Sequence, residues 1–309
     1  MTLAPEIVTF LKLRAESGLP EVWQAPVEVI RANTYARLSN TGIPEKIFSV
    51  TNRFIPGPTA DLPIRVYRPS EAENLPALVF FHGGGWVLGF LDIYDAALHA
   101  LANRTGSVII SVHYQKAPEH PYPTAFNDCF ATLLWVSSHA VELGIDHRKI
   151  GVGGDSAGGN LASAVALKAR DCGVVKLAYQ LLLYPCNERD FETPSYLAFA
   201  DGFGLPRKGM QWFWEQYLQG EDHDSDPYAC PSKATDFSNL APAIIVTAEY
   251  DPLKDDGVKY ERLLKGAGVP TSYFDYKGMI HGFVTMGAIT PTAQRAIEEC
   301  ATQIKTLLR

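Results

Sequence analysis

The feature that most limits how this chain can fold is an alternation of short apolar runs with helical patterns. Eight runs rich in Val, Ile, Phe, Tyr and Leu predict strands, at about 46–54, 62–69, 77–81, 107–112, 149–153, 178–183, 243–248 and 271–276. The first two runs contain alternating polar residues and Pro or Gly breaks, which favours an exposed antiparallel hairpin. Most of the later runs are almost entirely apolar, as buried parallel strands are.

The segment TAFNDCFATLLWVSS, which follows the fourth run, has the periodicity of an amphipathic helix. Its apolar side chains recur at i, i+3, i+4, i+7 and i+8, namely Phe126, Cys129, Phe130, Leu133 and Leu134. One face of such a helix packs on a sheet. Strands that alternate with helices imply right-handed crossovers and a mainly parallel sheet flanked by helices. The predicted fold class is therefore α/β.

Two helical regions, about 1–45 and 188–226, do not fit this alternation. In the second region, RKGMQWFWEQYLQG carries an apolar stripe made of Met210, Phe213, Trp214, Tyr217 and Leu218. Such a stripe is typical of a helix that faces the core. We expect residues 46–309 to form the main domain, and we expect 1–45 and the inserted segment 188–226 to form a helical cap over the carboxyl edge of the sheet.

Composition excludes several classes of function. The net charge of −7 argues against nucleic-acid binding, because domains that bind nucleic acid are usually basic. The N-terminus does not read as a signal peptide, and no run of apolar residues is long enough to span a membrane. The five cysteines lie far apart without a C-x-x-C pair, so we expect reduced thiols and a cytoplasmic protein. No H-E-x-x-H pattern or Cys/His cluster is present, and we expect no metal and no cofactor.

The stretch GVGGDSAGGN, residues 151–160, places five glycines around one serine. Its core is a G-x-S-x-G pattern of Gly154, Ser156 and Gly158, between a predicted strand and a predicted helix. In a strand–turn–helix of this kind the serine occupies a sharp turn where bulky neighbours would clash. A dinucleotide loop is excluded because its third glycine would fall at position 156, and no G-K-[ST] is present for a phosphate loop. A tight turn without chemistry remains the alternative.

A second glycine cluster lies in FFHGGGW, residues 80–86, directly after the third strand. Three successive glycines allow the backbone to turn its N–H groups toward a ligand. An acyl-transfer enzyme needs such donors for the oxygen that becomes negative in the transition state. The carboxyl ends of parallel strands are also where open α/β sheets bind ligands.

Two histidines, His223 and His281, follow Ser156 in the chain and are candidates for a general base. The order Ser, acid, His is the one that accompanies a G-x-S-x-G turn. His223 lies in the acidic loop EDHDSDP, which reads as solvent-exposed, whereas His281 follows the last predicted strand. The position of His281 therefore favours it as the base.

The candidate acid is Asp251, in AIIVTAEYDPLKDDG, at the carboxyl end of the seventh predicted strand. It precedes Pro252, so it is also well placed to cap the following helix. Glu249, two residues earlier, is the alternative acid.

Together, HGGGW, GDSAGGN, DPLKDDG and HGF resemble the hormone-sensitive-lipase-like carboxylesterases of the α/β-hydrolase fold. The resemblance extends from about residue 60 to 285, and residues 1–45 resemble the variable cap of that family only loosely. The block YQKAPEHPYPTAFND, 114–128, is similar to the family's YRLAPEHPFPAA. It departs at Gln115 and Lys116, where the family usually has Arg-Leu, which leaves a local loop contact in question.

Residue by residue, the resemblance implies a nucleophile at Ser156, an acid at Asp251 and a base at His281. It also implies an oxyanion hole made of three backbone N–H groups, those of Gly83, Gly84 and Ala157. His82 and Asp155 are interpreted as residues that hold the two glycine-rich loops.

The implied function is that of a serine carboxylesterase that cleaves small uncharged esters with short to medium acyl chains, and the resemblance also allows a homodimer. An apolar pocket of limited size would suit such substrates, and its candidate lining residues are Trp86, Trp212, Phe213 and Trp214. The same side chains, together with Tyr217, could serve packing alone. The alternatives are a ligand-binding receptor on a hydrolase fold, and an amidase or peptidase with the same triad.

Overall fold

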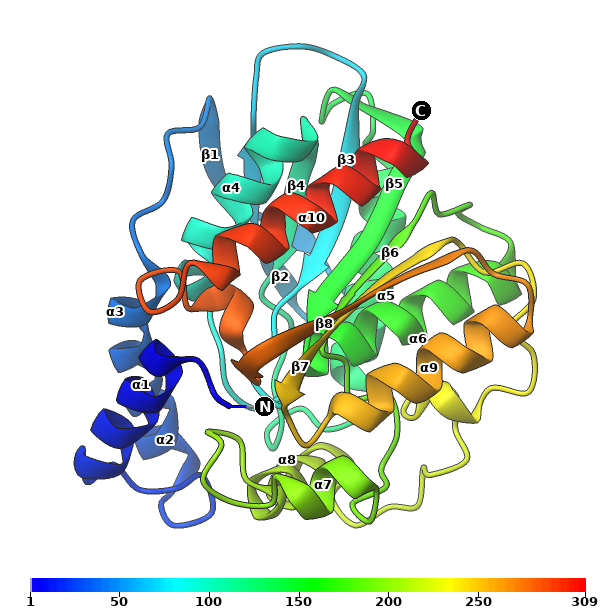
Figure 1. Cartoon of the computed structure of the whole chain (residues 1–309). Coiled ribbons are helices and arrows are strands. Elements are labelled where there is room, and N and C mark those ends of the chain that lie inside the picture. Colours follow the sequence, from blue (N-terminus) through cyan, green and yellow to red (C-terminus); the bar gives the residue numbers. More distant parts are fainter. Residues whose placement is uncertain (1) are drawn as a thin grey trace.

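The computed structural model describes residues 2–309 and contains one eight-stranded sheet with the strand order β1-β2-β4-β3-β5-β6-β7-β8 (Figure 1). The strands are β1 (Ser49–Pro56), β2 (Asp61–Arg68), β3 (Leu75–Phe81), β4 (Val108–Val112), β5 (Ile145–Asp155), β6 (Gln180–Leu183), β7 (Ala243–Tyr250) and β8 (Thr271–Ile280). All eight predicted strands are therefore confirmed, with shifts at their ends, and the α/β class is confirmed.

Strand pairing follows the predicted division into a hairpin and a parallel sheet. β1 and β2 pair antiparallel, with Ile55 opposite Leu62, and β2 pairs antiparallel with β4. From β4 to β8 every pairing is parallel. Only β1 matches the prediction of an exposed hairpin. β2 lies between β1 and β4, and its side chains Leu62, Ile64 and Tyr67 are buried.

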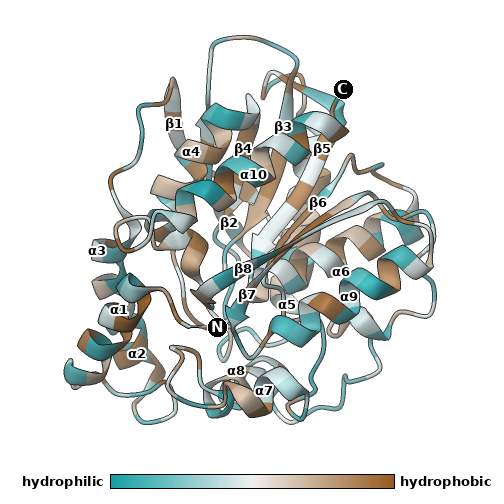
Figure 2. Ribbon diagram, in the orientation of Figure 1, coloured by the Kyte–Doolittle hydropathy of each residue, from teal (hydrophilic) through white to brown (hydrophobic). Residues whose placement is uncertain are grey.

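Helices cover both faces of the sheet (Figure 1). On one side lie α5 (Thr124–Ser138), α6 (Ala157–Cys172) and α9 (Lys254–Gly266), and on the other lie α4 (Asp95–Thr105) and α10 (Thr292–Leu307). Because side chains alternate along a strand, β3 sends Val79 and Phe81 into the first layer and Leu78 and Phe80 into the second. Figure 2 shows apolar strands between helices whose outer faces are polar.

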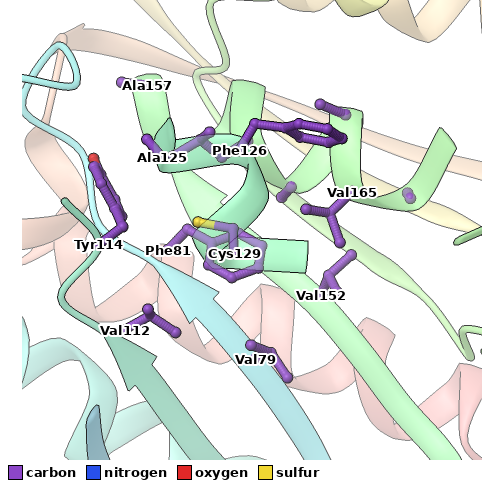
Figure 3. Packing of buried hydrophobic residues seen from close by; sticks show 14 of the residues in the cluster. Val79, Phe81, Val112, Tyr114, Ala125, Phe126, Cys129, Val152, Ala157 and Val165 are labelled. Carbon is purple, nitrogen blue, oxygen red and sulfur yellow. The ribbon is translucent and has the colours of Figure 1, made fainter. Parts of the chain in front are cut away.

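The predicted helix 124–138 coincides with α5. Phe126, Cys129 and Leu133 are buried, whereas Phe130 is half-buried and Leu134 is 37% exposed. The stripe is therefore narrower than its periodicity predicted. Figure 3 shows Phe126 and Cys129 with Val79, Phe81 and the other labelled side chains of this core.

The two regions outside the strand–helix alternation lie together at the carboxyl end of the parallel strands (Figure 1). The first contains α1 (Pro5–Glu16), α2 (Val27–Asn33), a 3-10 turn (Thr34–Arg37) and α3 (Leu38–Thr41), and the second contains α7 (Pro194–Ala198) and α8 (Arg207–Leu218). α8 buries all five residues of its predicted stripe. Further 3-10 turns lie at Leu91–Tyr94, Pro231–Lys233 and Phe283–Thr285. No helix within residues 2–309 is both long and apolar enough to cross a bilayer.

Candidate active site

Ser156 lies at the sharp turn between β5 and α6, as the glycine pattern predicts. Its backbone has φ 54° and ψ −120°, a conformation that is uncommon for a residue with a side chain. The two flanking glycines make the turn sterically feasible. A Cβ on Gly158 would lie 1.9 Å from the carbonyl oxygen of Phe81, and a Cβ on Gly154 would lie 2.3 Å from the carbonyl oxygen of Gly158.

Ser156, His281 and Asp251 form a continuous hydrogen-bonded chain although they are far apart in the sequence. The distance from His281 Nε2 to Ser156 Oγ is 2.9 Å, and the distance from His281 Nδ1 to Asp251 Oδ2 is 2.7 Å. With the proton on Nδ1, the imidazole donates to Asp251 and accepts from the serine hydroxyl. Asp251 is fully buried and Ser156 is 6% exposed. The three predicted residues therefore have the geometry of a nucleophile, a base and an orienting acid.

The two oxygens of Asp251 serve different partners, so its two predicted roles are compatible. Oδ2 faces His281, while Oδ1 accepts a hydrogen bond of 2.8 Å from the N–H of Leu253 at the start of α9. The alternative acid, Glu249, instead accepts a hydrogen bond of 2.8 Å from the N–H of Gly278 in β8. The alternative base, His223, lies beside Glu221 in a polar loop. The geometry favours Asp251 and His281.

The structure corrects the predicted oxyanion hole at Gly83. The Gly83 N–H lies 2.7 Å from Asp155 Oδ1 and 2.8 Å from the hydroxyl of Tyr94, so it is already engaged. Gly84 and Gly85 line the cavity beside Ser156, and within residues 2–309 their N–H groups have no hydrogen-bond acceptor. Ala157 begins α6, so its N–H has no acceptor within the helix. The available donors are those of Gly84, Gly85 and Ala157.

Asp155 links the two glycine-rich loops, as interpreted from the sequence. It ends β5, and its carboxylate accepts from the Gly83 N–H and, at 3.2 Å, from the hydroxyl of Tyr94. Burial raises the pKa of Asp155 to about 6, although the Gly83 and Tyr94 hydrogen bonds oppose this shift. Sequence reasoning identified this linking role but did not foresee that it would occupy the Gly83 amide.

His82 holds the same loop from the other side. Its Nδ1 lies 2.8 Å from the Gly83 carbonyl oxygen, and its ring stacks on Tyr114 with a centroid distance of 4.3 Å. Burial lowers the pKa of His82 well below its ordinary value, an effect strengthened by His113 and Lys116. The imidazole is therefore neutral at neutral pH and acts as a buried support.

The two departures from the family block are accommodated by local hydrogen bonds. The Gln115 side-chain Nε2 donates to Thr59 Oγ1 at 2.6 Å, and Lys116 Nζ donates to the Gly89 carbonyl oxygen at 3.0 Å. Burial, with the nearby Arg31, lowers the pKa of Lys116 to about 8. This segment supports the glycine loop and does not reach the triad.

A cavity of about 140 Å³ opens beside Ser156 and His281. Residues of the two predicted cap regions, 1–45 and 188–226, line it, including the apolar Phe10, Val22, Leu205, Pro206, Met210 and Phe213. Within residues 2–309, no group of His, Cys, Asp and Glu side chains is arranged to hold a metal ion.

Of the four aromatic residues predicted to line the pocket, only Phe213 does so, and the structure corrects the other three. Trp86 is fully buried and stacks on Tyr217 with a centroid distance of 4.2 Å. Trp214 is also fully buried, and Trp212 packs half-buried against the core. For Trp212 and Trp214 the reason is helical geometry, since consecutive residues of α8 point in different directions.

Three charged residues of the cavity wall, Arg14, Glu21 and Arg37, were not predicted. Arg14 lies on α1, Glu21 lies in the loop that follows, and Arg37 ends the 3-10 turn. Charged residues on short helices usually face solvent, and no motif marks these three. Only the tertiary packing of residues 2–45 brings these three side chains to the cavity.

Comparison with known proteins defines the class to which this fold and site belong. A sequence model described as the alpha/beta hydrolase fold matches residues 78–285. The chain belongs to that family and, within it, to the hormone-sensitive-lipase-like carboxylesterases.

Individual relatives agree with this assignment. The chain is 43% identical over 240 residues to the carboxylesterase NlhH of Mycobacterium tuberculosis, which covers 76% of this chain and 75% of the relative. It is 35% identical over 285 residues to an arylesterase of Saccharolobus solfataricus, which covers 92% and 93%. The solved structure of a hyperthermophilic esterase from Pyrobaculum calidifontis, 38% identical, superposes with a TM-score of 0.93 and covers 99% of both chains. The chain is a carboxylic ester hydrolase.

Proposed function

We propose that this enzyme cleaves esters with short to medium acyl chains through Ser156, His281 and Asp251. The observation that carries the proposal is the hydrogen-bonded chain of 2.9 Å and 2.7 Å that joins the three side chains at the edge of a cavity. In a triad the base must be within hydrogen-bond reach of the nucleophile and must itself be oriented by a third group. Both conditions hold here.

The proposed reaction has two steps. His281 Nε2 takes the hydroxyl proton as Ser156 Oγ attacks the ester carbonyl, and the same proton then passes to the departing alcohol. Water, deprotonated by His281, hydrolyses the acyl-enzyme and regenerates the serine. Asp251 keeps the imidazole in the required tautomer and stabilises the imidazolium that forms.

We propose Gly84, Gly85 and Ala157 as the donors of the oxyanion hole. Donors of this kind act because they are already oriented toward the developing negative charge. The Asp155 carboxylate supports the arrangement indirectly, because it holds the preceding Gly83 amide.

The size of the substrate is inferred from the cavity. Its volume of about 140 Å³ and its apolar wall, which includes Met210 and Phe213, favour acyl chains of limited length. One relative, 32% identical over 312 residues, is an ethyl acetate hydrolase of Pseudomonas putida. We propose small esters of this general kind for the present chain.

The test is hydrolysis of 4-nitrophenyl esters from acetate to dodecanoate by the wild type and by three variants. We expect the highest kcat/KM at the shorter chains, and a loss of kcat of at least about 10³-fold in Ser156→Ala and of about 10⁴-fold in Asp251→Asn. Glu249→Gln is the matched control and should retain most of its activity. Full activity of Ser156→Ala would refute the nucleophile assignment, and a larger loss in Glu249→Gln than in Asp251→Asn would refute the acid.

The same assay separates the alternatives from different classes. An amidase or peptidase would also cleave the matching 4-nitroanilides, which a pure esterase would leave intact. A ligand-binding receptor would cleave no ester and would bind a small apolar ligand tightly. The presence of all three triad members at bonding distance favours an enzyme over the receptor.

Two predictions concern the cellular setting. No disulfide joins the five cysteines within the described chain, and four of them are buried. This supports the proposal of a reducing, cytoplasmic location, to be checked by fractionation of the native cells. The homodimer allowed by the family resemblance stays a prediction, to be checked by light scattering.

A further inference from the structure

Two arginines from the first cap region face the cavity that contains Ser156. Arg14 comes from α1 and Arg37 from the end of the 3-10 turn, and both line the same space as Ser156 and His281. Neither belongs to the triad or to the oxyanion donors.

The donor groups of these two guanidinium groups are largely unused. Within residues 2–309, the side chains of Arg14 and Arg37 make no hydrogen bond, and Arg37 has no carboxylate within 4.0 Å. The one charged partner of Arg14 is Glu21, at a nitrogen–oxygen distance of 3.7 Å. A guanidinium carries five N–H donors in a planar fork, so most of the donors of this pair are available to a ligand.

The pair is also electrostatically unfavourable as it stands. Burial, with the nearby charge of Arg37, lowers the pKa of Arg14. The charge of Arg37 also acts on Asp155 and on the hydroxyl of Tyr94, next to the nucleophile. Two like charges that face one cavity repel each other, and a bound anion would remove that cost.

The remaining polar groups of the cavity wall do not fill the position at which an anion would bind Arg14 and Arg37. Asn40 and Thr41 add polar atoms beside the two arginines. The carboxylates that line the cavity are Glu21, which faces Arg14, and Asp155, which is buried against Gly83 and Tyr94. The charged and polar groups of the wall therefore come mainly from the first cap region, whereas α8 contributes the apolar Met210 and Phe213.

We propose that Arg14 and Arg37 form a carboxylate-binding subsite, so that the enzyme prefers esters that carry one free carboxylate away from the scissile carbonyl. This inference rests on the proposed esterase function and narrows its substrate class. Arginine suits the role because its fork matches the two oxygens of a carboxylate. Uncharged esters are still substrates, but poorer ones.

The test compares substrate pairs that differ only in charge. One pair is the 4-nitrophenyl monoester of adipic acid and its monoamide, with the carboxylate on the acyl side. The other is 4-carboxyphenyl butyrate and 4-carbamoylphenyl butyrate, with the carboxylate on the alcohol side. We expect the acid to exceed its amide in kcat/KM by about tenfold or more in at least one pair.

Variants of Arg14 and Arg37 then test whether these two side chains cause the preference for the acid over the amide. Arg37→Gln and Arg14→Gln should each reduce the acid-to-amide ratio severalfold, and Arg37→Lys should restore part of it because a charge remains. Arg148→Gln is the matched control, since Arg148 pairs with Asp146 at the surface and its loss should leave the ratio unchanged. Arg14 and Arg37 are both solvent-exposed, so the variants of both should fold.

A ratio near one in both pairs for the wild type would overturn the subsite, and so would an unchanged ratio in Arg37→Gln. Either result leaves the proposed function intact as long as the amides are cleaved. Absence of hydrolysis of all four compounds would instead count against the esterase function itself.

Discussion

Asp155 shows how one buried side chain ties the nucleophile turn to the glycine loop. Its carboxylate lies where burial opposes ionisation, and the Gly83 N–H, the Tyr94 hydroxyl and the charge of Arg37 compensate only in part. Burial outweighs these interactions, so ionising Asp155 costs free energy in the folded protein. The order of the loop should therefore depend on pH.

Asp155→Asn tests this dependence through stability. The pKa of Asp155 is raised from 3.8 to about 6 in the folded protein. Its contribution to the free energy of unfolding is therefore fully present below about pH 4, where the side chain is protonated, and is lost as the pH rises through about 6. Asparagine does not titrate. We expect the free energy of unfolding of the wild type, relative to the variant, to fall by about 2 kcal/mol between pH 4 and pH 7. Urea unfolding of both proteins across this range measures the difference, and a pH-independent difference would contradict it.

The glycine loop also shows why a residue's chemical type does not settle its role. Gly83 and Gly84 cannot be distinguished in the sequence. In the structure the Gly83 N–H donates to Asp155, whereas Gly84 lines the cavity. Which amide is free depends on the partner that each one meets. No local pattern within HGGGW distinguishes them.

At the scale of elements, α8 combines a packing face with a pocket-lining face. Trp214 and Tyr217 pack with Trp86 in the core, while Phe213 contacts the cavity close to Gly85. A Cβ on Gly85 would lie 2.2 Å from the Phe213 ring, so the cap and the glycine loop touch directly. Substitutions on the packing face of α8 should therefore affect mainly stability, and substitutions on its cavity face should affect substrate preference.

Trp214→Ala and Phe213→Ala test that separation. Trp214→Ala should lower the free energy of unfolding by about 3–5 kcal/mol, because it empties a large buried site, and should leave the order of preferred acyl chains unchanged. Phe213→Ala should shift the preference toward longer chains. Thermal unfolding and the ester series measure both effects. A changed chain preference in Trp214→Ala alone would show that the assignment of the two faces is reversed.

At the scale of the whole molecule, Arg31 fastens the first cap region to the main domain. From α2 it donates to the carbonyl oxygens of Val87 and Ala117 at 2.9 Å and 2.8 Å, and it forms two hydrogen bonds of 2.7 Å with Glu119. This ion pair lowers the pKa of Glu119 to about 2, although Glu119 is more than half exposed and solvent weakens the pair. The proposed division into cap and main domain places this contact at their boundary.

Arg31→Met should make the first cap region open more often. Losing these hydrogen bonds should cost about 1–2 kcal/mol of local stability, or about a 5- to 30-fold rise in the open population. Limited proteolysis should show faster cleavage within residues 1–45 while the remainder stays resistant. Arg53→Met is the control, because Arg53 pairs with Glu142 outside the cap. Equal cleavage rates in the two variants would contradict this domain organisation.

Much of this fold could be predicted from the sequence, because the features that specify it act between residues that are close together in the chain. The bounds of α5, the buried stripe of α8 and the glycines that relieve the turn at Ser156 depend on periodicity and on steric limits within a few residues. His281 and Asp251 were identifiable because each follows a strand, and parallel strands deliver their carboxyl ends to one edge.

The tertiary structure alone decided which groups are free to act once that edge is assembled. The Gly83 N–H is hydrogen-bonded to Asp155, and the side chains of Trp86 and Trp214 are buried in the core. Arg14 and Arg37 line the cavity although they lie in a region without a motif. Each outcome depends on a contact between segments that are distant in the chain. Periodicity and spacing describe what one segment prefers, whereas availability for chemistry is a property of the partner against which that segment packs.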